Sequence, residues 1–151
     1  MDACRRLYGA DLVSLAIFGS WAREVATQAS DVDVLVVAEP LPPSRLKRVR
    51  QFEQIEKETL PARRSMWPQD VPAPEISPVL KTPEEVRAGS PLFLDMTQWC
   101  DILYDRDRFF EEFIDELRAR LERNGARRVQ SKGGYYWEYK PNIRPNEVVE
   151  L

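Results

Sequence analysis

IFGSWAREVATQASDVDVLVV, residues 17–37, is the most informative stretch of this 151-residue chain. It holds Gly19-Ser20, then ten residues, then Asp31-Val32-Asp33. An apolar run at 12–18 stops at the glycine, and a second at 32–38 begins within the acidic motif. Short apolar runs that end at turn residues, the second rich in β-branched side chains, indicate buried strands. The two motifs are therefore predicted to lie where one strand ends and the next begins.

Asp31 and Asp33 are predicted to form a cation-binding pair. Side chains two apart on a strand project from the same face, so both carboxylates point one way while Val32 and Val34 point into the core. Magnesium prefers oxygen ligands and borrows several from substrate phosphates, so one or two protein carboxylates suffice. This spacing predicts a divalent-metal site at the start of the second strand.

Gly19 and Ser20 are predicted to hold phosphate beside that metal. Glycine lacks a Cβ and lets the backbone approach closely, and Ser20 adds a hydroxyl and the N–H groups of a helix start. A triphosphate next to a metal site supports in-line displacement at the α-phosphorus of a nucleoside triphosphate. Metal ions then offset the charge that builds on the leaving pyrophosphate.

The remaining sequence predicts helices and strands around this pair. Apolar residues after Ser44 recur every third position among charges, as in a helix lying on a sheet. Thr82-Pro83-Glu84-Glu85 has the cap, proline and glutamate of a helix start. Pro78 removes a donor from a strand ladder and so places its strand at an edge or a bulge. The predicted elements are helices over 44–60, 82–88 and 105–124, strands over 75–81 and 101–104, and a surface loop over 61–74.

These elements predict an α/β (α+β) fold in one domain spanning residues 1–151. The length and the 43% hydrophobic content fit a single core. We expect a small mixed β-sheet that carries the metal site at one edge, with helices packed on one face. Residues 126–151 are predicted to form a C-terminal aromatic tail or extension. Their aromatic cluster at 135–139 is interpreted as a core edge or a subunit contact rather than a surface that stacks on a base.

Composition excludes several classes of function. The chain has no histidine, which excludes Ser-His and Cys-His nucleophilic pairs. Cys4 and Cys100 lie too far apart for a CxxC motif and indicate a reduced compartment. A net charge of −3 argues against nucleic-acid binding driven by counterion release. With no long apolar run and no secretion signal, we expect no membrane attachment and a cytoplasmic protein.

The chain resembles the polymerase-β-like nucleotidyltransferases, and among them the minimal nucleotidyltransferase (MNT-like) group. The signature of that superfamily is an apolar strand, Gly-Ser or Gly-Gly, a spacer and Asp-x-Asp, which reads here IFGSWAREVATQASDVDVLVV. The resemblance implies the nucleotidyltransferase fold. It also implies transfer of a nucleoside monophosphate from a triphosphate to a hydroxyl acceptor, with release of pyrophosphate.

The same resemblance implies roles for individual residues. Gly19 and Ser20 would hold the triphosphate, while Asp31 and Asp33 would ligate Mg²⁺ or Mn²⁺. Arg23 would contact a phosphate oxygen, although a surface ion pair is an equal alternative for one arginine among many.

A third carboxylate is implied on the strand after the first long helix, where it would complete the nucleophile-side metal. Order along the chain points to Glu75, and the alternatives are Asp70, Asp95 and Asp101. One position departs from the group's pattern: many members have a glycine where this chain has Glu24. An acidic side chain there would repel a triphosphate unless it points away.

Two functions stay open at this point. One is an active, magnesium-dependent enzyme. The other is a catalytically silent module that uses the same cleft to bind nucleotide or a partner protein, since some members of the group are antitoxins of helical HEPN-type toxins. The acceptor is open between a protein, a tRNA and a small molecule, and so is assembly into a homo-oligomer.

Overall fold

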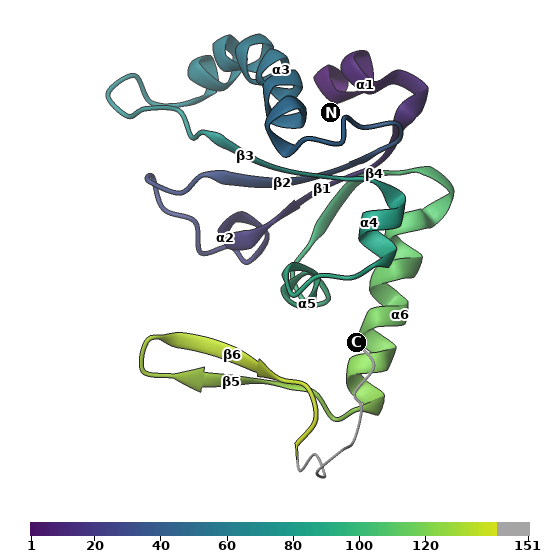
Figure 1. The fold of residues 1–151 in the computed structure, drawn as a ribbon. Coiled ribbons are helices and arrows are strands. Elements are labelled where there is room, and N and C mark those ends of the chain that lie inside the picture. The colour runs from purple at the N-terminus through teal and green to yellow at the C-terminus, as the bar shows by residue number, and fades with distance from the viewer. Residues whose placement is uncertain (142–151) are drawn as a thin grey trace.

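A mixed four-stranded sheet forms the centre of the computed structural model, which describes residues 1–141 (Figure 1). Its order is β3-β2-β1-β4. β1 is antiparallel to β2 and to β4, whereas β2 and β3 are parallel, so the predicted mixed sheet is confirmed. The strands are β1 (Leu12–Phe18), β2 (Val32–Ala38), β3 (Ile76–Lys81) and β4 (Asp101–Asp105).

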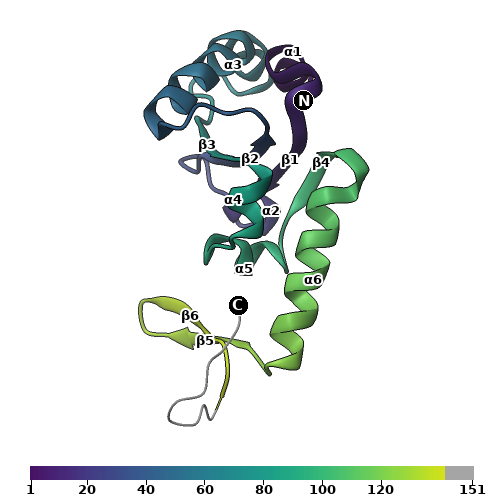
Figure 2. The same cartoon turned by 45° about the vertical axis from the view of Figure 1, so that its right-hand side comes forward.

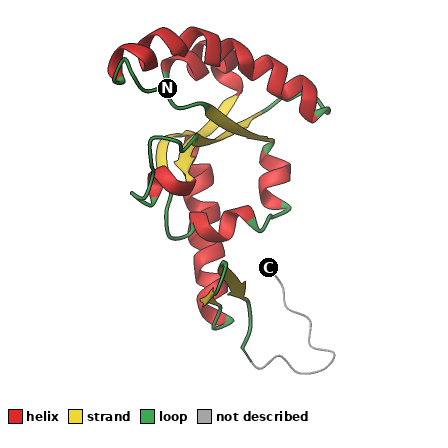
Figure 3. Cartoon of the chain, turned by 90° about the vertical axis from the view of Figure 1, so that its left-hand side faces the viewer, coloured by secondary structure: helices red, strands yellow, loops and turns green. Residues whose placement is uncertain are grey.

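Helices cover both faces of this sheet, which corrects the expectation that they pack on one face (Figures 2 and 3). One apolar cluster joins the sheet to α1 and α3, and a second joins the opposite face to α4, α5 and α6. β1 and β2 are apolar at nearly every position, so each strand has two faces that must leave water. The helices are α1 (Asp2–Tyr8), α2 (Gly19–Ala22), α3 (Arg45–Met66), α4 (Pro83–Arg87), α5 (Leu92–Met96) and α6 (Phe109–Arg123), with 3-10 turns at Gly9–Asp11 and Arg106–Arg108.

The Gly-Ser and Asp-x-Asp motifs meet at one end of the two central strands. β1 and β2 are antiparallel, so the end of β1 and the start of β2 lie together, with Phe18 opposite Asp33. The sequence placed the metal site at an edge of the sheet. The edge strands are instead β3, which accommodates Pro78 as predicted, and β4.

α3 extends to Met66 and so occupies part of the stretch expected to be a loop. Pro61 lies inside this helix at an exposed position, although proline removes one N–H donor from a helix interior. The guanidinium of Arg63 donates to the carbonyl of Pro74, and that of Arg64 donates to the carbonyl of Val71. Within residues 1–141, no helix combines the length and the apolarity that a membrane span requires.

The predicted start of α4 is confirmed in detail, whereas α6 begins at Phe109 rather than at the predicted residue 105. Thr82 and Glu85 form a complete capping box at α4. The Asp105 carboxylate accepts the N–H groups of Phe110 at 3.0 Å and Glu111 at 2.9 Å, and the Ser14 hydroxyl donates to it at 2.6 Å. Asp105 therefore fastens the start of α6 to β1. The buried face of α6 comprises Phe110, Ile114, Leu117 and Leu121.

Part of the predicted tail is a β-hairpin, β5 (Arg127–Ser131) and β6 (Gly134–Glu138). Figure 1 shows it lying on the side of the molecule that carries α2 and α5. Lys132 and Gly133 form its turn, between the paired residues Ser131 and Gly134. Residues 142–151 of the predicted tail lie outside the described part of the chain.

Candidate functional site

Gly19 is required at the end of β1 for two independent reasons. Its φ of +71° lies in the left-handed region that favours glycine. A Cβ placed on it would overlap Oδ2 of Asp33 and lie 3.0 Å from its Cγ. Backbone and carboxylate therefore touch where the sequence predicted a phosphate cradle beside a metal ligand.

Asp31 and Asp33 lie close enough to influence each other. Partial burial raises the pKa of Asp33 above its usual range, a hydrogen bond from Ser77 lowers it, and the negative charge of Asp31 raises it again. Val32 and Val34 pack into the apolar cluster of α1 and α3, so Asp33 faces the other way as the alternation predicts. Two neighbouring carboxylates beside a glycine that leaves space fit a hard cation with oxygen ligands.

The structure does not bring Glu75 into a cluster with these aspartates. Its carbonyl accepts the N–H of Val32 at 2.8 Å, but its side chain is exposed just before β3 begins. The register partner of Asp33 on β3 is Ser77. Among residues 1–141 there is no group of three or more Cys, Asp or Glu side chains placed to hold a metal ion.

Of the three alternative carboxylates, Asp95 lines a pocket with Gly19, whereas Asp70 and Asp101 do not. Asp70 is exposed in the loop after α3, and Asp101 is exposed at the start of β4. Asp95, on α5, accepts hydrogen bonds from the Tyr135 hydroxyl and from Nε1 of Trp137, the latter at 2.8 Å. Asp95 therefore fastens the hairpin to the body of the molecule, a contact that the sequence analysis missed because the two segments are far apart in the chain.

Arg23 and Glu24 follow α2 directly, but they differ in their exposure to solvent and in their contact with the pocket. Arg23 is half-buried and lines a pocket with Gly19. Glu24 has φ +58° and is exposed, and it is not among the residues that line this pocket. A left-handed backbone favours glycine, the residue that the resemblance implies at this position. The expected repulsion of a triphosphate by Glu24 finds no support in this geometry.

The pocket beside Gly19 has a volume of about 160 Å³. Gly19 at the start of α2 and Arg23 just after its end line this pocket. Asp95 of α5, Trp99 and the hairpin residue Tyr135, which lie later in the chain, also line it. The sequence analysis identified Gly19 and Arg23 as site residues, but not the aromatic residues Trp99 and Tyr135. Trp137 and Tyr139 pack against the core, as expected for a core edge, whereas Tyr135 lines the pocket beside Gly19.

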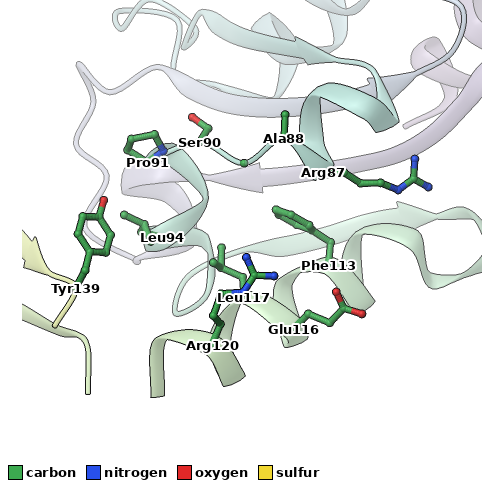
Figure 4. A pocket seen from close by; sticks show the side chains of 11 residues that line it. Arg87, Ala88, Ser90, Pro91, Leu94, Phe113, Glu116, Leu117, Arg120 and Tyr139 are labelled. Carbon is green, nitrogen blue, oxygen red and sulfur yellow. The ribbon is translucent and has the colours of Figure 1, made fainter. Parts of the chain in front are cut away.

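A larger cavity, about 340 Å³, lies between the α4–α5 loop and α6 (Figure 4). Arg87, Glu116 and Tyr139 are among its lining side chains, and Figure 4 shows Leu94 and Phe113 on its walls. None of the residues of the Gly-Ser or Asp-x-Asp motifs lines it. Of these motif residues, Gly19 lines the smaller pocket, whereas Ser20, Asp31 and Asp33 are not among its lining residues.

Several toxin–antitoxin structures share the fold. A chain in the crystal structure of a toxin-antitoxin with AMP-PNP matches with a TM-score of 0.52 and 14% identity, over 81% of this chain and 86% of that one. A chain of a mutant MntA-HpeT toxin-antitoxin matches at 0.54 and 13%, over 81% and 83%. A chain in the complex of a tri-AMPylated Shewanella oneidensis HEPN toxin with MNT antitoxin matches at 0.50 and 14%, over 81% and 80%. At these identities the likeness concerns the fold alone.

Sequence comparisons identify the family. A Methanocaldococcus jannaschii protein named "Putative protein adenylyltransferase" is 32% identical over 125 residues, which cover 82% of this chain and 79% of that protein. The sequence profile of the Nucleotidyltransferase domain family matches residues 1–81, which include both motifs and β3. The chain belongs to the nucleotidyltransferase domain family.

Proposed function

We propose that the chain moves a nucleoside monophosphate from a triphosphate to a hydroxyl group and releases pyrophosphate. The observation that carries this proposal is the contact between Gly19 and the Asp33 carboxylate, with the charge of Asp31 next to it. The name of the Methanocaldococcus jannaschii relative favours an adenosine nucleotide as donor and a protein as acceptor.

Asp31 and Asp33 would hold the divalent cation, Mg²⁺ or Mn²⁺. A bound cation relieves the repulsion between the two carboxylates and, during transfer, offsets charge on the leaving pyrophosphate. Ser77, which donates to Asp33, orients that carboxylate. Glu75 stays a prediction as third ligand, and its exposed side chain gives it no support.

Gly19, Ser20 and Arg23 would bind the triphosphate. Gly19 lets phosphate oxygens approach the backbone, the Ser20 hydroxyl donates to them, and the Arg23 guanidinium neutralises their charge from the wall of the pocket. Stabilising the charge that develops on pyrophosphate lowers the barrier to transfer.

The test is pyrophosphate release from each of the four nucleoside triphosphates with Mg²⁺ or Mn²⁺ and a cell extract as source of acceptors. We expect Asp33→Asn to fold and to lose at least about 100-fold in rate, because charge stabilisation at the phosphates depends on this carboxylate. Asp11→Asn is the matched control: Asp11 is exposed at the opposite end of β1. Equal rates for Asp33→Asn and the wild type would contradict the proposal.

A second candidate is a silent antitoxin that binds a HEPN-type toxin. It is favoured by the lack, among residues 1–141, of a third carboxylate grouped with Asp31 and Asp33, and by the toxin–antitoxin structures that share the fold. This candidate predicts no pyrophosphate release with any triphosphate. It also predicts that wild type and Asp33→Asn protect cells equally from a HEPN-type toxin of the same genome.

A further inference from the structure

Tyr135 brings a hydroxyl group to the pocket that also contains Gly19 and Arg23. It lies on β6, more than 100 positions from the Gly-Ser motif, and reaches the pocket because the hairpin docks on α5 (Figure 2). Its phenol donates a hydrogen bond to Oδ2 of Asp95. The positive charge of Arg23 influences the same phenol. An acceptor hydroxyl, a carboxylate and a candidate phosphate ligand therefore share one small space.

The neighbouring side chains hold Tyr135 in this place. The Arg128 guanidinium lies 3.4 Å from the centre of the Tyr135 ring and 4.8 Å from that of Trp99. Nε1 of Trp137 occupies the other oxygen of Asp95 at 2.8 Å, which fixes the carboxylate relative to the phenol. A hydroxyl held by stacking and by an oriented carboxylate has the arrangement of a nucleophile with its base.

We propose that the enzyme modifies itself at Tyr135, by transferring a nucleoside monophosphate from the triphosphate to the Tyr135 hydroxyl of the same chain. This inference rests on the proposed nucleotidyl transfer. It adds an acceptor, a base and a modification site in the hairpin, which follows the part of the chain matched by the family profile.

Oδ2 of Asp95 takes the phenolic proton, and the Tyr135 oxygen forms a bond to the α-phosphorus. The bond from that phosphorus to the bridging oxygen breaks, and pyrophosphate leaves with the electron pair. The product is a phosphodiester between Tyr135 and the nucleoside monophosphate, and Asp95 then releases its proton to water.

Asp95 is needed because the phenol is neutral. The hydrogen bond to Asp95 raises the pKa of Tyr135, as do partial burial and the negative charge of Asp95, whereas Arg128 and Arg23 lower it. At neutral pH the hydroxyl keeps its proton and needs a base to become a nucleophile. The proton already points at the carboxylate that would receive it.

The experiment incubates the full chain with Mg²⁺ and each triphosphate labelled at the α-phosphate, and follows label on the chain and pyrophosphate together. Label on the chain is localised by fragmentation of the peptide covering residues 133–140, which contains Tyr135, Tyr136 and Tyr139. We expect the label on Tyr135, at a rate that does not change over a tenfold range of chain concentration, because donor site and acceptor lie in one molecule.

Matched variants separate this site from its neighbours. Tyr135→Phe should lose the label at least about 100-fold, whereas Tyr136→Phe should keep it, because Tyr136 is 55% exposed and does not line the pocket. Asp95→Asn should slow labelling at least about tenfold. Hydrogen exchange of the hairpin in Asp95→Asn shows whether the loss reflects the missing base or an undocked hairpin. Slow labelling by Asp95→Asn with unchanged hydrogen exchange in the hairpin supports Asp95 as the base. Slow labelling together with fast exchange in the hairpin means that the hairpin has undocked, and it overturns the role of Asp95 as the base.

Pyrophosphate release and labelling of other molecules without label on Tyr135 would overturn the self-modification and leave the proposed function standing. Absence of pyrophosphate with every triphosphate would overturn both. Label on Tyr136 or Tyr139 alone would also overturn the assignment. If Tyr135→Phe weakens triphosphate binding while wild-type Tyr135 stays unlabelled, the pocket holds the nucleoside, and the modification site is rejected.

Discussion

Gly19 and Asp33 determine each other's position at the residue scale. The carboxylate occupies the space that any other residue at position 19 would fill with its Cβ. The sequence predicted both residues through the spacing of the Gly-Ser and Asp-x-Asp motifs. It could not predict their direct contact, which depends on the register of β1 against β2.

Gly19→Ala should therefore lose activity as well as stability. The left-handed backbone costs about 1–2 kcal/mol with an alanine, and the new methyl group displaces Asp33. Gly89→Ala is the matched control, because Gly89 has φ +79° but open space around it. Urea unfolding should show a comparable backbone cost in both variants, and pyrophosphate release should fall only in Gly19→Ala. An active Gly19→Ala would contradict the site.

Glu24→Gly should stabilise the chain. A glutamate with φ +58° carries backbone strain of about 1–2 kcal/mol, which glycine would relieve. The greater freedom of glycine in the unfolded chain offsets about 0.5–1 kcal/mol of that relief. We expect a net rise of about 0.5–1 kcal/mol in the free energy of unfolding, measured by urea denaturation, with pyrophosphate release retained. Glu24→Ala removes the charge but keeps the strained backbone, and it should show no such gain.

The predictions for helices and strands are correct where the signal lies within a few residues. They fail where contacts with distant segments determine which side chains are buried. The cap of α4 lies within four residues and was predicted correctly. The charged outer face expected for α3 is interrupted by Arg48, which is only 8% exposed, while Leu46 of the predicted apolar face is 59% exposed. Arg48 Nη1 donates to the Leu80 carbonyl at 3.1 Å and to Glu85 at 2.6 Å. These partners come from β3 and α4, so no pattern within α3 could identify them.

Arg48→Ala should be strongly destabilising. It leaves the Leu80 carbonyl without this donor and removes an ion pair whose arginine is buried, although Glu85 is 39% exposed and water weakens its share. We expect a loss of about 2–4 kcal/mol in urea unfolding. Lys47→Ala, at the exposed neighbouring position, should change stability by less than about 0.5 kcal/mol. Equal effects of the two substitutions would show that Arg48 has no structural role.

The ion pair between Arg48 and Glu85 also predicts how stability changes at acidic pH. The hydrogen bond from Arg48 is the main reason that the pKa of Glu85 lies below its ordinary value of 4.5. A lowered carboxyl pKa adds stability above the ordinary value, and that stability is lost as the pH falls through the folded value. The difference in unfolding free energy between wild type and Arg48→Ala should therefore shrink between pH 6 and pH 3. A difference that is constant over this range would contradict the ion pair.

The whole molecule consists of a sheet covered on both faces and a separate hairpin. The nearly continuous apolar strands indicate a sheet that is covered on both faces. The sequence did not show which helices lie on which face, because that depends on contacts between distant segments. The hairpin was missed because its short strands are half polar and its attachment comes from α5. A metal and phosphate site could thus be predicted from the sequence, whereas its aromatic wall could not.

Trp137→Phe tests how the two parts are joined. Phenylalanine keeps the apolar contact but cannot donate to Asp95. Amide hydrogen exchange should speed up in β5 and β6, while β1 and β2 keep the protection of the wild type. Faster exchange throughout the sheet would instead mean that the hairpin stabilises the whole fold.

The hairpin has a consequence for how such enzymes diversify. The residues proposed to bind the nucleotide lie in the first half of the chain, whereas Tyr135 of β6 lines the pocket that also contains Gly19 and Arg23. In the proposed reaction, mutations in the hairpin would change which hydroxyl groups are admitted without altering the residues that bind the nucleotide. Exchanging the hairpin between paralogues would be an economical evolutionary route to new targets.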